Sequence, residues 1–214
     1  MKNVKIVGIG PGHPDYLLPA ATKALKVASV VIGGSRQLEA VAELNDNTWL
    51  LERNYPETVE YIKEHWETED IAVAVSGDSG FYSLLNYLKR NLPGVPLNVI
   101  PGISSLQYLY AKAGLSWESS RWLSAHGREP DFSPFTVGGC SLGILTDAVW
   151  NPAVICGELC RMGAGDSIVV IGENLSYPQE RIRVGMAKTF CDEIDFDMNA
   201  MILLNPEDSV SIVR

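Results

Sequence analysis

The sequence is poor in the two residue types that most often bind transition metals. It has three histidines among 214 residues, and its four cysteines are Cys140, Cys156, Cys160 and Cys191. No two cysteines have Cys-x-x-Cys spacing, and Cys156 and Cys160 lie one helical turn apart with no histidine nearby. This pattern is atypical of a zinc centre or a disulfide framework. We therefore expect reduced, half-buried thiols and no metal site.

Basic residues are also scarce. The chain has 17 Lys and Arg against 26 Asp and Glu, which gives a formal net charge of −9. No Lys/Arg cluster offsets this charge, so a nucleic acid would be repelled. An anionic small substrate must be held by a few local basic groups.

A long apolar run is missing as well. No stretch approaches the roughly 18 apolar residues that cross a bilayer. The sequence opens on MKNVKIV, which is typical of a strand and not of a secretion signal. With 46% hydrophobic and 20% charged residues, the composition is that of an ordinary globular protein and not of a disordered one. We expect a cytoplasmic protein that does not enter membranes.

The first half alternates short apolar runs with helical patterns, which indicates a largely parallel sheet covered on both faces. The expected strands are Val4–Ile9, Val30–Ile32, Thr48–Leu51, Ile71–Val75 and Leu97–Ile100. The expected helices are Pro19–Val27, Ser35–Leu44, Pro56–Trp66, Phe81–Arg90 and Ser104–Ala113. Pro19 suits a first helical turn, Ser35 an N-cap, and Gly114 the position after a helix. We take residues 1–114 as one α/β domain.

The pattern changes after Gly114. Longer, alternating segments predict a second α/β domain, residues 115–214, with a mixed sheet that is richer in antiparallel pairing. The expected strands are Arg121–His126, Ser141–Thr146, Ser167–Gly172, Arg181–Ala187 and Asn199–Leu204. One strong helix interrupts them, with Asn151 as its N-cap and Gly163 after its end.

The first of four turns that follow expected strands is Gly8–Pro14, which reads GIGPGHP. It differs from a dinucleotide fingerprint, because its third glycine is at the wrong spacing and Pro11 has no N–H to offer a phosphate. A ligand that lacks phosphate and approaches bare backbone would suit this turn. A strand-to-helix turn with no ligand is the alternative.

The other three turns are ambiguous when each is taken alone. Ser76–Tyr82 places Asp78 between glycines, where its carboxylate can accept hydrogen bonds from ribose hydroxyls or cap the next helix. Ile100–Ser105 ends on two serines that can cap a helix or contact a ligand. Gly172–Ile182 reads as a polar hairpin turn. In isolation, capping and turn formation explain all three.

Their order and spacing, however, resemble the tetrapyrrole methylase family over essentially the whole chain. The matching motifs are GxGPG at Gly8–Gly12, a GDP-type loop at Gly77–Ser79, PGxSS at Pro101–Ser105, Glu-Asn-Leu at Glu173–Leu175 and Glu-Arg-Ile at Glu180–Ile182. Ser79 departs from the pattern, since proline is usual there. The resemblance implies two α/β domains, with S-adenosyl-L-methionine bound in the cleft between them, and a homodimer.

Two further segments resemble the cobalamin-pathway C5-methyltransferases of this family. They are Ile32–Leu38 (IGGSRQL) and Leu123–Arg128 (LSAHGR). The resemblance implies S-adenosylmethionine-dependent C-methylation of cobalt-precorrin-7 or precorrin-6Y at C5. The sequence ends at Arg214 without the second methyltransferase domain of the fused enzymes, so we expect a separate C15-methyltransferase and decarboxylase as partner.

The resemblance also assigns candidate site residues. For the carboxylate arms of the substrate we expect Arg36 and Arg128, which can bind carboxylates bidentately, with His126 as a hydrogen-bonding or proton-relay group. Arg36 paired with Glu39 and His126 as an ordinary strand residue are the alternatives. The expected cofactor residues are Gly10, Pro11, Gly12, Gly77, Asp78, Ser79, Gly80, Tyr82, Ser104, Ser105, Leu145, Thr146, Gly172 and Glu173.

The chemistry places few demands on side chains. Methyl transfer from a sulfonium is an in-line displacement whose leaving group needs no proton, so neither a Ser-His-Asp triad nor a thiolate is required, and neither is visible. Alignment of the reactants and exclusion of water would supply most of the acceleration.

Three alternatives stay open. One is a methyltransferase of the same fold that acts at another tetrapyrrole position, or on a protein or RNA, although the acidic balance argues against RNA. Another is a non-catalytic module that binds S-adenosylmethionine or a nucleotide. The third, an NAD-dependent oxidoreductase, is disfavoured by the first turn and by Gly33 and Gly34, which follow the second strand where an acidic residue would stand.

Overall fold

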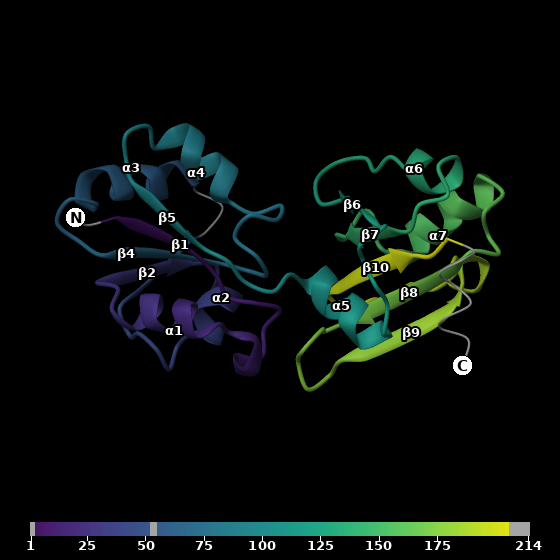
Figure 1. Ribbon diagram of the computed structural model, residues 1–214, viewed down its shortest axis with the longest axis horizontal. Coiled ribbons are helices and arrows are strands. Elements are labelled where there is room, and N and C mark those ends of the chain that lie inside the picture. The colour runs from purple at the N-terminus through teal and green to yellow at the C-terminus, as the bar shows by residue number, and fades with distance from the viewer. Residues whose placement is uncertain (1–2, 52–54, 206–214) are drawn as a thin grey trace. The chain divides into compact units, whose positions relative to one another are not determined.

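The computed structural model describes residues 3–51 and 55–205. The chain divides between Ser104 and Ser105 into two compact units (Figure 1). The sequence-based boundary after residue 114 lies at the other end of helix α5 (Ser105–Ala113), which packs on strands β7 (Leu142–Leu145) and β10 (Asn199–Leu203) of the second unit.

The sheet of the first unit is entirely parallel, with the strand order β3-β2-β4-β1-β5. Its strands are β1 (Val4–Gly8), β2 (Val30–Gly33), β3 (Thr48–Leu50), β4 (Ile71–Val75) and β5 (Leu97–Ile100). Every residue of β4 is buried, as expected of a central strand covered on both faces. The predicted parallel sheet is therefore confirmed.

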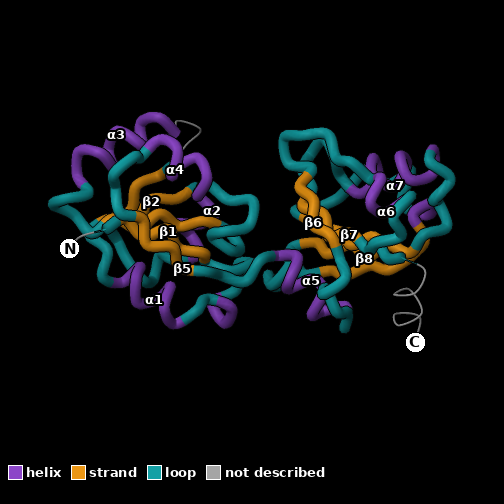
Figure 2. Tube along the Cα trace, turned by 45° about the horizontal axis from the view of Figure 1, so that its top comes forward, coloured by secondary structure: helices purple, strands orange, loops and turns teal. Residues whose placement is uncertain are grey.

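Helices cover both faces of this sheet (Figure 2). They are α1 (Pro19–Lys26), α2 (Ser35–Ala40), α3 (Tyr55–His65) and α4 (Leu85–Asn91), with a short 3-10 turn, η1 (Pro14–Tyr16). Alternate strand residues face opposite layers: Ile6 packs with the buried side chains of α3 and α4, whereas Val7 packs with α1. Each fully buried Leu or Ile in these layers contributes about 1.5–3 kcal/mol relative to an exposed one.

The sheet of the second unit is mixed, as predicted, with the order β6-β7-β10-β8-β9. Only the β6–β7 pair is parallel. The strands not yet introduced are β6 (Arg121–Ser124), β8 (Ile168–Glu173) and β9 (Arg181–Met186).

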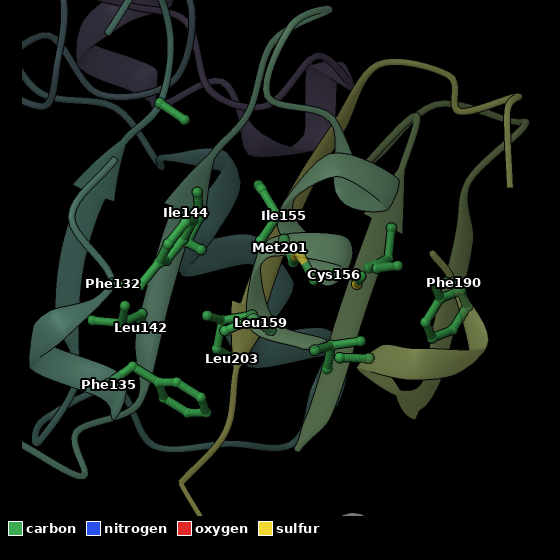
Figure 3. Packing of buried hydrophobic residues seen from close by; sticks show 14 residues of the cluster. Phe132, Phe135, Leu142, Ile144, Ile155, Cys156, Leu159, Phe190, Met201 and Leu203 are labelled. Carbon is green, nitrogen blue, oxygen red and sulfur yellow. The ribbon is translucent and has the colours of Figure 1, made fainter. Parts of the chain in front are cut away.

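One face of this sheet carries the main core of the second unit. Helix α7 (Pro152–Arg161), the short α6 (Ser133–Thr136) and the 3-10 turn η2 (Ala187–Thr189) pack there, and Figure 3 shows Ile155 and Leu159 of α7 against Met201 and Leu203 of β10. The other face receives α5.

The predicted elements match the structure closely, with some differences. The expected helix Ser35–Leu44 ends at Ala40, and the turns η1 and η2 were not predicted. The expected helix from Phe81 begins only at Leu85, because Tyr82 adopts a φ of 48° that no helix tolerates. Ser35 is not the N-cap of α2, since the helix already begins at Ser35 and Gly34 precedes it. The short α6 was not predicted. Among the described residues, no helix is long and apolar enough to cross a bilayer.

Three of the predicted helix-end residues are confirmed. The side chain of Asn151 accepts a hydrogen bond from the Val154 N–H at the start of α7. Gly114 and Gly163, which follow α5 and α7, have φ values of 69° and 77°, which a glycine adopts without strain.

Candidate active site

Three of the glycine-rich turns meet at one edge of the first sheet. Strands β4, β1 and β5 are neighbours and parallel, so the turns that follow them leave the sheet side by side at its carboxyl edge. Open α/β sheets bind ligands at this edge. The structure thus brings together the predicted loops Gly8–Pro14, Ser76–Tyr82 and Ile100–Ser105.

Backbone contacts join these loops. Gly10 and Gly77 exchange two backbone hydrogen bonds, at 3.1 and 2.8 Å. A Cβ on Gly102 would lie 2.2 Å from the Gly77 carbonyl oxygen, and one on Gly8 would lie 2.7 Å from the Gly102 nitrogen. Glycine is therefore required at these positions by the close approach of the three backbones.

Asp78 connects the second loop to the third. Its Oδ1 accepts a hydrogen bond from the Gly80 N–H at 2.8 Å, and its Oδ2 accepts one from the Gly102 N–H at 2.9 Å. It does not cap the next helix, which begins seven residues later at Leu85. Each carboxylate oxygen has a second lone pair, so Asp78 retains capacity to accept a hydrogen bond from a ligand.

Two of the neighbouring serines, Ser79 and Ser104, are buried. Ser79 is fully buried, and its hydroxyl donates to the Ile100 carbonyl at 2.7 Å, which ties the same two loops again. Ser104 is also buried, and Ser105 is the first residue of α5. Tyr82, by contrast, is about half exposed in its strained conformation, with its ring edge-on to that of Phe81. Strain of this kind tends to occur at functional sites.

The first loop offers little to a phosphate. The Ile9 N–H is bonded to the Val75 carbonyl and the Gly10 N–H to the Gly77 carbonyl. Pro11 has no N–H, and Gly12 follows with a φ of 147°. A phosphate site needs successive amides aimed outward, and the amides from Ile9 to Pro11 do not supply them. The loop instead presents half-buried backbone at Pro11 and Gly12.

Arg36 lies at the same edge of the first sheet. It is the second residue of α2, and its Nη2 donates to the hydroxyl of Ser76 at 3.1 Å, directly after β4. Gln37 donates to the same hydroxyl at 2.5 Å. Beside them is an open hollow of about 470 Å³ whose lining includes Leu51 and Tyr55.

In the second unit, the predicted His126 and Arg128 belong to a turn that is fixed by a residue the sequence did not single out. Both side chains are exposed and flank Gly127, whose φ is 67°. The Oδ2 of Asp147 accepts a hydrogen bond from the Gly127 N–H at 2.8 Å. This bond and that from the Trp150 N–H hold the pKa of the Asp147 carboxyl below its usual range. Gly127 follows β6 and Asp147 follows β7, and the parallel pairing of these two strands brings the turns after them together.

Three other predicted cofactor residues of this unit have contacts within the fold. Leu145 is the half-buried last residue of β7. The Thr146 hydroxyl bonds to Asn199, at 2.7 Å to its carbonyl and 2.6 Å to its Oδ1. A Cβ on Gly172 would lie 2.6 Å from the side chains of both Leu109 and Leu175. Glycine at that position makes room for α5.

Glu173 has a structural role that the sequence pattern did not indicate. Its side chain is fully buried and receives two hydrogen bonds from Arg181, both of 3.0 Å. The Nε of Arg183 lies 3.1 Å from the same carboxylate, and the Asp197 N–H donates to it at 3.2 Å. A buried carboxylate needs such partners. Its assignment to the cofactor stays a prediction.

The family is decided by comparison with known proteins. The model of the Tetrapyrrole (Corrin/Porphyrin) Methylases matches residues 3–191. A relative from Salmonella typhimurium, named cobalt-precorrin-7 C(5)-methyltransferase, is 31% identical over 200 residues, which cover 94% of this chain and 98% of the relative. The chain belongs to the tetrapyrrole methylase family.

Solved structures of other tetrapyrrole methylases have the same fold. The precorrin-6Y methylase of Archaeoglobus fulgidus superposes with a TM-score of 0.76 at 22% identity, covering 95% of this chain and 98% of the other. The uroporphyrin-III C-methyltransferase of Thermus thermophilus, complexed with S-adenosylhomocysteine, gives 0.77 at 24% identity, with 94% and 97% covered. The expected two-unit α/β fold is therefore confirmed.

Two cysteines of the second unit have thiols with raised pKa values. Burial raises the pKa of Cys156 to about 12, and burial together with the Cys160 thiol raises that of Cys191 to about 11. Both thiols are therefore protonated at neutral pH.

Proposed function

We propose that the protein methylates the cobalamin-pathway tetrapyrrole cobalt-precorrin-7 at C5, with S-adenosyl-L-methionine as methyl donor. The observation that carries this proposal is the 31% identity to the Salmonella enzyme over nearly the full length of both chains. The fold alone does not select a carbon atom of the macrocycle, because the Thermus enzyme of similar fold is named for another tetrapyrrole.

The residues at the carboxyl edge of the first sheet fit S-adenosylmethionine. The ligand carries no phosphate, and the amides of Ile9 and Gly10, which a phosphate would need, are already used. The spare lone pairs of Asp78 suit ribose hydroxyls or an ammonium group, and Pro11 and Gly12 allow close approach to backbone. When bound, S-adenosylmethionine supplies an electrophilic methyl group.

The chain's own residues then bind and orient the reactants. The interlocked loops around Gly8, Gly77 and Gly102 form a rigid surface, which favours a single alignment of the methyl group. Arg36 and Arg128 hold carboxylate arms of the macrocycle, and His126 donates a hydrogen bond or takes up the proton that the methylated carbon releases. Acceleration comes from alignment and exclusion of water.

Ligand titration separates this function from its rivals. Calorimetry should show binding of S-adenosylhomocysteine and none of NAD, with ATP bound far more weakly. With S-adenosylmethionine and cobalt-precorrin-7, mass spectrometry should find a product one methyl group heavier. Binding without turnover would indicate a non-catalytic module, and tighter binding of ATP would refute the proposed cofactor.

We further propose a cytoplasmic homodimer that works with a separate enzyme for C15 methylation and decarboxylation. The Salmonella relative, of which the chain covers 98%, is named for C5 alone, which supports a division of labour between polypeptides. Light scattering after gel filtration tests the dimer. Accumulation of product methylated at C5 alone, when the pure protein is assayed, tests the need for a second enzyme.

A further inference from the structure

Two cysteines of the second unit lie in contact, away from the residues assigned to methyl transfer. Cys160 is in the last turn of α7, and Cys191 follows η2 and Phe190. Their Sγ atoms are 3.2 Å apart, although the residues are separated by 31 positions in the sequence. Both side chains are half-buried.

The backbone around the two thiols is fixed by tertiary contacts. The N–H groups of Ala187 and Lys188 bond to the carbonyls of Ser167 and Gly165, both at 2.9 Å. A Cβ on Gly165 would lie 3.0 Å from the Sγ of Cys160, so this turn closes over one side of the pair. The Cys191 thiol donates to the Ala187 carbonyl at 3.5 Å. The thiols are therefore held together by the fold itself and not by chance rotamers.

We infer that Cys160 and Cys191 form a reversible disulfide when the folded protein meets a low-molecular-weight disulfide. One cysteine thiolate attacks a sulfur of glutathione disulfide and releases one glutathione. The other then attacks the mixed disulfide and releases the second glutathione. Two protein thiols are oxidised and one small disulfide is reduced, and the two protons lost by the cysteines end on the two released glutathione thiolates.

The remaining cysteines are poor partners. Cys156 is fully buried in the core of the second unit (Figure 3). Cys140 is half-buried, and its Sγ is directed to the Gly138 carbonyl, 3.7 Å away. The pair Cys160–Cys191 is thus the favoured cross-link among the described cysteines.

The environment of the pair also predicts the rate of the reaction. Cys191 must act as a thiolate in one of the two steps, whichever cysteine reacts first. Burial raises its pKa to about 11, so little thiolate is present at neutral pH and oxidation should accelerate as the pH rises toward that value.

The cross-link would stabilise the second unit. It would close a loop that contains β8, β9 and the Gly172–Ile182 turn. Loss of chain entropy in the unfolded state should raise Tm by about 5–10 °C for a loop of this length.

The test uses the full chain, incubated without denaturant in reduced and then oxidised glutathione at pH 7, 8 and 9. Wild type should lose two hydrogen atoms in mass, yield a Cys160–Cys191 linked peptide after digestion, and gain Tm, all reversed by dithiothreitol. The matched variant Cys140→Ser should behave in the same way.

Cys160→Ser and Cys191→Ser should each form no intramolecular link and show no gain in Tm on oxidation. A link from Cys156 to either thiol, or glutathione adducts in place of a link in wild type, would overturn the inference. Because thiol mapping and Tm need no tetrapyrrole, the outcome is independent of the proposed methylation.

Discussion

The carboxylate of Asp78 is joined to the backbone of Gly102, 24 residues further along the chain, by a hydrogen bond of 2.9 Å. With the bond to Gly80, this contact holds two of the three glycine loops in one arrangement. Asp78 therefore shapes the proposed cofactor surface whether or not it also contacts the ligand.

Asp78→Ala should weaken binding of S-adenosylhomocysteine by roughly 5–150-fold, because removal of a hydrogen-bonded carboxylate from the loops costs about 1–3 kcal/mol. Calorimetry measures the affinity, and Asp46→Ala, at an exposed position of the same unit, is the control. An affinity equal to wild type would show that the loops keep their form without this carboxylate.

Gly102→Ala tests the close approach of the loops. The new Cβ would meet the Gly77 carbonyl oxygen at 2.2 Å and force the backbones apart. We expect lower Tm and at least tenfold weaker binding of S-adenosylhomocysteine, since each tenfold step corresponds to about 1.4 kcal/mol. Gly157→Ala in α7 is the matched control, because nothing lies within 4 Å of its Cβ and alanine stabilises a helix by about 0.5–1 kcal/mol. Unchanged affinity in Gly102→Ala would refute the role given to this contact.

How far the sequence predicts the structure depends on the range of the interaction. The run Ile71–Val75 is apolar throughout and predicts a central strand, and the motif spacing places three loops at the edge where they are found. The sequence did not indicate the role of Asp147, because its partner Gly127 lies 20 residues away and only the pairing of β6 with β7 brings the two residues together. The motif around Glu173 likewise gives no local sign that Arg181 and Arg183 enclose its carboxylate.

Glu173→Gln separates the structural role of this carboxylate from the predicted ligand contact. The substitution removes the buried one of the two charged partners of Arg183, and breaking a buried pair costs about 3–5 kcal/mol. Urea unfolding should show a loss of that order. Glu193→Gln also removes an ion pair of Arg183, but from a side chain that is 38% exposed, so we expect a smaller loss, near 1 kcal/mol or below. If Glu173→Gln keeps its stability and instead loses affinity for S-adenosylhomocysteine, the carboxylate belongs to the cofactor site.

The lowered pKa of Asp147 predicts that the free energy of unfolding depends on pH. Its pKa is lower in the folded state than in the unfolded chain, so its contribution is present above the unfolded value and is lost as the pH falls through the folded one. The difference in unfolding free energy between wild type and Asp147→Asn should be full at pH 7 and shrink below about pH 4. Urea titrations across this range measure it. If the difference in unfolding free energy between the two proteins grows as the pH falls, the stabilising role given to the ionised Asp147 carboxylate is wrong.

The same variant tests the turn that carries His126 and Arg128. Asp147→Asn should raise the Michaelis constant for the tetrapyrrole while affinity for S-adenosylhomocysteine stays unchanged. The control is Asp131→Asn, which weakens a comparable hydrogen bond, the one that the Asp131 carboxylate accepts from the Ser133 N–H. If both variants raise the Michaelis constant equally, the effect comes from a general destabilisation of the second unit and not from the turn around Gly127.

Substitutions of Arg128 test the proposed substrate binding most directly. The macrocycle bears several carboxylates while the protein has a net charge of −9, so capture must depend on local positive groups. A bidentate arginine–carboxylate contact contributes about 1.5–3 kcal/mol, and lysine keeps the charge but loses the planar fork. Arg128→Ala should therefore raise the Michaelis constant by roughly 10–150-fold, and Arg128→Lys by less.

The control is Arg161→Ala. Arg161 is an exposed arginine paired with Glu158 at the end of α7, and its substitution should leave the Michaelis constant unchanged. Affinity for S-adenosylhomocysteine should equal wild type in all three variants. An unchanged Michaelis constant in Arg128→Ala would mean that the carboxylates are held elsewhere and that Arg128 is an ordinary surface charge.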